Sequence, residues 1–225
     1  MCHRYFQAHQ SAKVAERYAA KHMGVVGEEV PAEVFPGHQS VIVLSDKGER
    51  IVTSMYWGFI PGWIKDEDMA GYDKPNNARS ETAIRNLMDG RGMYFQAMHS
   101  GRCILSASGW CEWTGEKGSK VAHRLTVRGD EFVSFAGLYT YRAGFPGFSC
   151  TMLTTAAQGK AAGFHQRVPV VVLSREDEDR WLDPSSDPRS LVDLFVSIPD
   201  DRLESEVLDE GPPVRCRKSG QGELF

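Results

Sequence analysis

The sequence lacks the features of an exported or membrane-bound protein. No apolar run in its 225 residues approaches the roughly eighteen residues that mark a membrane-spanning helix. The first thirteen residues are polar and contain no apolar stretch of the kind found in a secretory signal. These absences predict a soluble cytoplasmic protein without a membrane partner.

Paired cysteines are also missing. The five cysteines are odd in number and scattered, no CxxC pair occurs, and none stands with histidines at the spacing of zinc ligands. The sequence therefore predicts no metal site and no cofactor. In a reducing compartment most of these thiols are expected to stay free and to pack as small apolar side chains.

A surplus of positive charge is lacking as well. The net charge is −4 and the isoelectric point is near 6.0, which weighs against a nucleic-acid binder because such proteins more often carry a basic surplus. It does not exclude one, since only the groove that holds the strand needs a positive potential. Composition leaves this question open.

The first half of the chain contains one helix pattern and one hairpin pattern. Residues 11–23 are rich in helix formers, with Ser11 as the expected N-cap and Gly24 as the expected stop. Residues 40–45 and 50–56 are β-rich and are separated by an Asp-Lys-Gly turn, so they predict a hairpin.

Short elements continue through the second half. A helix is expected over 81–88, and strands between turn residues are expected over 102–106, 121–127, 132–138 and 149–155. Residues 168–173 are continuously apolar and predict a strand buried on both faces. Ser174 and Asp177 then form a capping-box pattern for a helix that runs through Trp181.

Several segments carry more specific residues than a fold requires. In chain order they read MC-x-R (from Met1), WG-x-IP-x-W (from Trp57), NARSET (from Asn77), ASG-x-x-EW (from Ala107), FAGL (from Phe135), TT-x-A (from Thr154) and H-x-R-x-P (from His165). This ordered set resembles the signature of the SOS response-associated peptidase (SRAP) family, and it extends from Cys2 to about Trp181. Three positions depart from the family pattern, with His3 in place of Gly, Cys111 in place of an aromatic residue and Val168 in place of Met.

The resemblance implies an α+β fold. We expect a single compact SRAP-like domain over residues 1–207, mostly antiparallel β with a barrel-like core and flanking helices. From residue 208 the composition shifts to Gly, Pro and charge, so 208–225 is expected to be a flexible tail.

Cys2 is the centre of the functional hypothesis. A small residue at position 2 permits removal of Met1 by methionine aminopeptidase, which would expose an α-amine of pKa about 8 beside a thiol of pKa about 8.5. An aldehyde can form an imine with the amine, and the thiol can then close a thiazolidine ring. The resemblance implies that this happens at ring-opened abasic sites in single-stranded DNA and gives a stable DNA–protein crosslink.

Three further residues are expected to serve this chemistry. Glu112 lies between two tryptophans, so desolvation should raise its pKa toward the range of a general acid or base. His165 can exchange protons near neutral pH, and the resemblance places it against the sugar. Asn77 can orient the terminal amine or the sugar through its amide group.

A second group is expected to hold the DNA. Arg4 and Arg79 suit phosphate oxygens, and Arg167 either does the same or braces the site. An aromatic platform that stacks on bases without reading sequence is expected from Trp57, Phe59, Pro61 and Trp63, with Trp57 interpreted as the more buried and Trp63 as the more exposed.

The last five residues form a separate motif. Gln221, Leu224 and Phe225 resemble the anchors of the short peptides by which bacterial proteins bind the replication sliding clamp. A short apolar segment on a flexible tail can fold onto a groove of such a partner.

Three functions remain open at this stage. The first is an abasic-site sensor that crosslinks DNA, with lyase side activity, acting as a monomer in the cytoplasm at the nucleoid and at replication forks. The second is a cysteine peptidase or autopeptidase that uses Cys2 and His165. The third is a non-enzymatic module that binds modified nucleic acid, which gives Cys2 and Glu112 no role.

Overall fold

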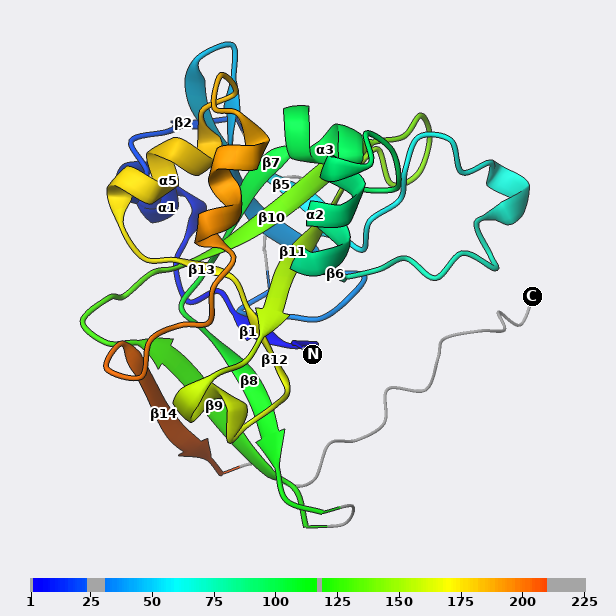
Figure 1. Cartoon of the computed structure of the whole chain (residues 1–225). Coiled ribbons are helices and arrows are strands. Elements are labelled where there is room, and N and C mark those ends of the chain that lie inside the picture. The colour runs from blue at the N-terminus through cyan, green and yellow to red at the C-terminus, as the bar shows by residue number, and fades with distance from the viewer. Residues whose placement is uncertain (1, 24–30, 117–118, 210–225) are drawn as a thin grey trace, which may run out of the picture.

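A closed five-stranded barrel forms the centre of the molecule (Figure 1). The computed structural model describes residues 2–23, 31–116 and 119–209. The barrel strands pair in the order β5, β4, β7, β10 and β11, with bounds Glu49–Trp57, Gln39–Asp46, Arg102–Ala107, Val133–Tyr141 and Phe148–Ala156. These neighbours are antiparallel, and a short parallel pairing of β11 with β5 closes the ring. The barrel-like core expected from the sequence is confirmed.

Alternation along the barrel strands separates two cores. Ile42, Leu44, Cys103 and Leu105 belong to one buried cluster, which also includes Tyr5 and Trp110 of the second sheet. The residues between them belong to the other cluster, which the helices cover. This is the period of two that a strand imposes on its side chains.

The segment after residue 166 lies between two barrel strands, β10 and β11, where these two stop pairing with each other. β10 and β11 pair from Tyr141↔Phe148 as far as Gly137↔Met152. Beyond that point β12 (Arg167–Pro169) pairs with β11, and β13 (Val171–Val172) pairs with β10. Val170 bonds to both strands through its backbone, at 2.9 Å each. The expected burial on both faces is confirmed, but the expected single strand is divided because it changes partner at Val170.

A second sheet lies below the barrel in Figure 1 and has the order β14-β9-β8-β1-β3. Its strands are Leu203–Leu208, Val121–Val127, Gly109–Thr114, Tyr5–Phe6 and Glu33–Val34. The sequence did not predict β8, which follows β7 almost directly. Gly109 permits this close passage: its φ is +147°, and a Cβ there would lie 2.7 Å from the Leu125 carbonyl oxygen.

Helices cover the outer face of the barrel. They are α1 (Ser11–Arg17), α2 (Ser80–Met88), α3 (Phe95–Ser100), α5 (Arg175–Leu182) and the 3-10 helix η2 (Pro188–Leu194). Two small strands add to the barrel by parallel pairing. They are β2 (Lys21–His22), which pairs with β5, and β6 (Asn77–Arg79), which pairs with β11. The remaining short helices are η1 (Asp66–Asp68) and α4 (Gly159–Ala162).

The helix expected over 11–23 is shorter than predicted. It ends at Arg17 and turns back at Ala19, whose φ is +49°, and its N-cap is Gln10 instead of Ser11. The Ser174 cap is confirmed, because the Ser174 hydroxyl accepts a hydrogen bond from the Asp177 amide at 3.0 Å. The expected stop at Gly24 and the tail from residue 210 lie outside the described residues.

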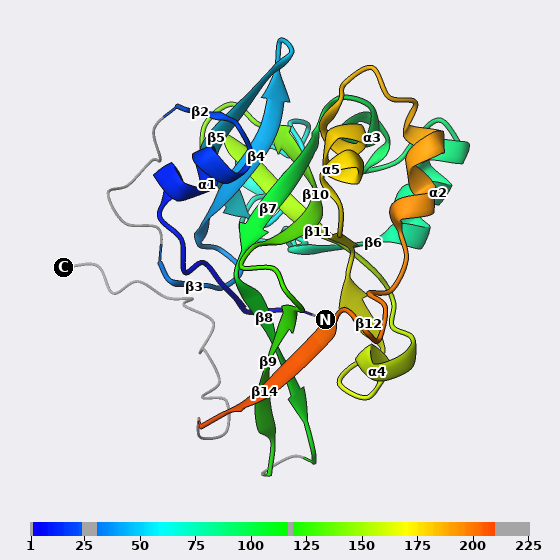
Figure 2. The same cartoon turned by 90° about the vertical axis from the view of Figure 1, so that its left-hand side faces the viewer.

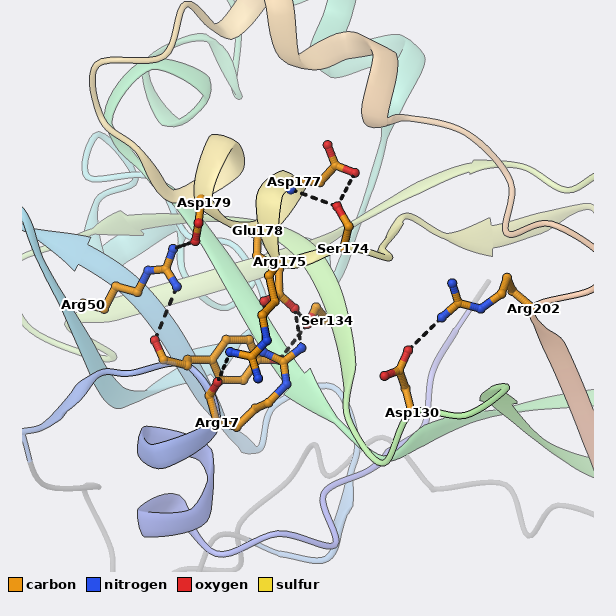
Figure 3. Close-up of polar contacts among 11 residues, drawn as sticks. Arg17, Arg50, Asp130, Ser134, Ser174, Arg175, Asp177, Glu178, Asp179 and Arg202 are labelled. Atoms are coloured by element: carbon orange, nitrogen blue, oxygen red, sulfur yellow. Dashed lines mark hydrogen bonds and ion pairs between the residues drawn. The ribbon is translucent and has the colours of Figure 1, made fainter.

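Buried polar contacts fasten α1 to α5 (Figure 3). Both Arg17 Nη atoms donate to the Glu178 carboxylate, at 3.0 and 2.9 Å. Ser134 of β10 donates to the same carboxylate at 2.5 Å and contacts the Tyr18 hydroxyl at 2.7 Å. The Glu178 side chain is 2% exposed, so its charge is compensated inside the protein.

The thiols behave as the sequence predicts within the described residues. Cys2, Cys103, Cys111 and Cys150 are buried, and none of these four thiols forms a disulfide bond. None of the described helices is long and apolar enough to cross a membrane.

Candidate active site

Cys2 is fixed at the N-terminal end of β1 by two asparagines. The Asn77 amide nitrogen donates to the Cys2 carbonyl at 2.7 Å, and the Asn76 amide nitrogen lies 3.3 Å from the same oxygen. Cys2 is 1% exposed, and its Sγ is 3.4 Å from the Arg4 carbonyl oxygen. β6 and the residue before it therefore hold Cys2 in place, while the side-chain Oδ1 atom of Asn77 is buried without a hydrogen-bond partner among the described residues.

Glu112 lies on β8, the strand that pairs with β1. It is 6% exposed, and its Oε1 atom is buried without a hydrogen-bond partner in the described part of the chain. Burial raises the pKa of Glu112 to about 7, against the opposing effect of the positively charged amino terminus. A carboxyl group with this pKa can donate and accept protons at neutral pH, as the sequence predicts.

The Cys2 thiol is protonated at rest. Burial raises its pKa well above the ordinary value, and the negative charge of Glu112 raises the pKa further. A neutral thiol is a weak nucleophile until a base takes its proton. Because Glu112 acts electrostatically on Cys2, it lies where such a base is needed.

His165 approaches the same place from the barrel side. It lies in the loop between α4 and β12, where the Arg167 amide donates to its Nδ1 at 2.9 Å. Burial lowers the pKa of His165, and the positive amino terminus lowers it further. His3 contributes in the same direction, so the residue that replaces the family's glycine lies within electrostatic reach of His165.

The amino terminus thus acts on both Glu112, which lies on β8, and His165, which lies in the loop before β12. In Figure 2 the dark blue start of the described chain runs between β8 and β12. Asn77 donates to the Cys2 carbonyl, and Glu112 acts electrostatically on the Cys2 thiol. His3 acts electrostatically on His165. The four residues proposed for catalysis, Cys2, Asn77, Glu112 and His165, are therefore brought together around the chain's first residues.

Two of the three proposed phosphate-binding arginines are already engaged. Arg4 donates to both oxygens of Glu33, at 3.1 and 2.7 Å. Arg167 donates to both oxygens of Glu81, at 2.6 and 2.9 Å, which fits the bracing alternative. Arg79 is exposed at the start of α2 and suits a phosphate best.

The aromatic platform requires a correction. Trp57 is fully buried, with its indole nitrogen donating to the Asn76 carbonyl at 2.8 Å, and Phe59 is 1% exposed. Neither can stack on a base, because the two side chains are packed in the two buried clusters. Pro61 is also buried, whereas Trp63 is 66% exposed and lines a pocket of about 440 Å³ with Tyr141.

Sequence reasoning missed the residues that hold the others in place. Asn76, Glu33 and Glu81 were not selected, because a partner's identity depends on which strands become neighbours. Asn76 precedes the NARSET segment directly, and this proximity was the available signal. Gln221, Leu224 and Phe225 lie outside the described residues. Within residues 2–23, 31–116 and 119–209, no cluster of His, Cys, Asp or Glu could hold a metal ion.

Comparisons with known proteins agree with this arrangement. The model of the SOS response associated peptidase (SRAP) family matches residues 1–210. The abasic site processing protein YoaM of Bacillus subtilis is 30% identical over 205 residues, covering 88% of this chain and 86% of YoaM. The abasic site processing protein YoqW of the same organism is 29% identical over 211 residues, with 91% of each chain covered.

A crystal structure of a Bacteroides thetaiotaomicron protein superimposes with a TM-score of 0.81. Its sequence is 22% identical, and the match covers 92% of each chain. At this level of identity the likeness concerns the fold alone, and it supports the mixed, mostly antiparallel architecture.

Proposed function

This chain belongs to the SOS response associated peptidase (SRAP) family, and on that premise we propose that it captures abasic sites in single-stranded DNA through Cys2. The observation that carries the proposal is the convergence of Glu112, with its pKa of about 7, on a buried N-terminal cysteine. Relatives named abasic site processing proteins support a role in abasic-site processing.

The reaction begins once Met1 has been removed. With its Nδ1 accepting a backbone hydrogen bond, neutral His165 can exchange the hydroxyl proton that moves when the sugar opens to its aldehyde. The Cys2 amine adds to the aldehyde carbon, and protonated Glu112 donates to the hydroxyl group that leaves as water. This gives the protonated imine, whose nitrogen keeps one proton, and leaves Glu112 as a carboxylate.

Ring closure uses the same carboxylate. Glu112 accepts the thiol proton and returns to its protonated form, Sγ adds to the carbon of the protonated imine, and the nitrogen becomes the neutral N–H of the ring. The thiazolidine product therefore contains the whole protein and DNA minus one water. Where closure fails, β-elimination from the imine breaks the strand on its 3′ side, which accounts for lyase side activity.

The peptidase alternative has less support. A thiol protease needs a thiolate next to a histidine that can hold a proton. Here burial raises the pKa of Cys2 and lowers the pKa of His165, and both shifts disfavour such an ion pair. A pure binding module would leave the buried, unpartnered Glu112 oxygen without a use.

The first experiment uses a single-stranded oligonucleotide that contains one abasic site. We expect wild-type protein to give a band that survives heat without borohydride, with an intact mass that lacks Met1 and gains the DNA minus one water. Cys2→Ala keeps the α-amine, so it should lose the stable adduct and retain some strand cleavage. Cys111→Ala, at another buried thiol on β8, is the matched control and should crosslink normally.

Two results would refute this mechanism. One is a heat-stable adduct formed by Cys2→Ala. The other is the absence of any adduct from wild-type protein whose Met1 is confirmed to be missing, which would favour the peptidase function or the binding module.

A second proposal concerns location and partners. We propose that exposed Arg79 and Trp63 help to hold the flanking DNA, and that the monomer is tethered to replication forks at the nucleoid through Gln221, Leu224 and Phe225. Deleting Leu224 and Phe225 should abolish binding of a bacterial sliding clamp in calorimetry. Failure of the intact chain to bind the clamp would refute the tether.

A further inference from the structure

The two proton-transfer residues of the site lie on separate parts of the fold, one on the second sheet and one in a loop of the barrel. Glu112 lies on β8 of the second sheet, whereas His165 lies in a loop that leaves the barrel strand β11 and returns to it as β12. Reactions of this kind depend on the relative position of the groups to within about an ångström. The reaction therefore requires a contact that holds the loop carrying His165 against the hairpin formed by β8 and β9.

His123 lies at the junction between these two parts. It is paired directly with Glu112 across β8 and β9, so the two side chains emerge on the same face of the sheet. The Thr114 hydroxyl and the His123 Nε2 atom are 2.7 Å apart, which orients the imidazole. The ring then meets Phe164 edge to face, with centroids 5.1 Å apart and planes inclined by 67°.

Backbone hydrogen bonds in the loop link Phe164 to the neighbouring His165. Phe164 and His165 both donate their amides to the Ala161 carbonyl, at 3.1 and 3.3 Å. The Arg167 amide closes the turn by donating to His165 Nδ1 at 2.9 Å. Since these bonds tie the imidazole to the turn that also carries Phe164, an anchor on Phe164 sets the position of His165.

We propose that His123 is a positioning residue for the abasic-site reaction: with Thr114 it holds Phe164, and through it His165, at a fixed place opposite Glu112. This inference rests on the proposed function, but the contacts on which it depends are separate from Cys2. His123 itself transfers no proton in this scheme.

Three substitutions separate the two contacts of His123. His123→Ala removes both the hydrogen bond and the ring contact. His123→Phe keeps an aromatic edge against Phe164, and Thr114→Val removes only the hydrogen bond. We expect His123→Ala to slow crosslinking roughly tenfold or more, His123→Phe to restore most of the rate, and Thr114→Val to have the smaller effect.

A double-mutant cycle with His165→Ala distinguishes positioning from general destabilisation. If His123 acts through His165, His123→Ala should change the rate by less than about twofold in the His165→Ala background. Affinity for an oligonucleotide with a stable tetrahydrofuran abasic analogue should be unchanged. The same tenfold loss in both backgrounds, or no rescue by His123→Phe, would overturn the proposal.

A second readout does not depend on crosslinking. Burial lowers the pKa of His165, so release of the loop should let that pKa return toward its ordinary value. An NMR titration of the His165 ring should show this rise in His123→Ala but not in His123→Phe. An unchanged His165 pKa in His123→Ala would overturn the positioning role, whereas absence of a wild-type adduct would count against the proposed function alone.

Discussion

Glu112 carries an ionisable carboxyl group that is deeply buried. The sequence predicts desolvation from the flanking indoles, and a raised pKa is confirmed. The two indoles differ: Trp110, two residues before Glu112 on β8, lies on the same face, whereas Trp113 points to the opposite face. The pairing of β8 with β1 and β9 adds to the burial of Glu112. Its catalytic role stays a prediction.

This burial has a cost that depends on pH. The carboxyl pKa rises from 4.5 to about 7 on folding, so the folded state binds the proton more tightly. The contribution of protonated Glu112 to the free energy of unfolding is fully present below pH 4.5 and is lost as the pH rises through 7. Glu112→Gln stays neutral, so its stability relative to wild type should increase by roughly 2–3 kcal/mol between pH 5 and pH 8.

Urea denaturation at the two pH values measures this difference. Glu81→Gln is the matched control, because Arg167 lowers the pKa of the Glu81 carboxyl and Glu81 therefore titrates below the tested range in both states. An equal difference for Glu112→Gln at pH 5 and pH 8 would contradict the account.

At the scale of elements, local patterns and partner-dependent patterns differ in how well they can be predicted. The hairpin β4–β5 follows from alternation around a turn, with Lys47 and Gly48 at positive φ, and the Ser174 cap follows from residues three apart. The division at Val170 could not be predicted in this way, because it arises where β10 and β11 separate. β8 was missed for the same reason, since a Gly and a Glu enter a strand only because β1 and β9 flank it.

The contact between α1 and α5 allows a test of element packing. Arg17→Ala leaves the Glu178 carboxylate, 2% exposed, without its cation. Removing one partner of a buried ion pair costs about 3–5 kcal/mol, and chemical denaturation should show a loss of this order. Lys13→Ala on the same helix breaks an exposed pair with Glu131 and should cost less than about 1 kcal/mol. Equal losses would show that the Glu178 network does not hold α1.

At the scale of the whole molecule, the ordered motifs predicted more than composition did. They implied a mostly antiparallel domain with a barrel-like core, and both the closed ring and the family match over residues 1–210 agree. The same motifs did not separate packing residues from surface residues, so Trp57 and Phe59 were grouped with Trp63. A net charge of −4 remains compatible with a DNA role because the predicted site needs few cations.

The burial of Cys2 also implies that Met1 is removed before the chain folds. Cys2 is 1% exposed, and its strand is enclosed by β3 and by β8, which begins more than a hundred residues later. An aminopeptidase must bind the residues that follow the bond it cleaves, and the burial of Cys2 denies it access to them. We therefore expect Met1 to be removed while the chain is still emerging from the ribosome. Folded protein that retains Met1 should resist methionine aminopeptidase, and urea-unfolded protein should lose Met1. Whether the protein can react would then be decided during synthesis, before the proposed DNA-binding face exists.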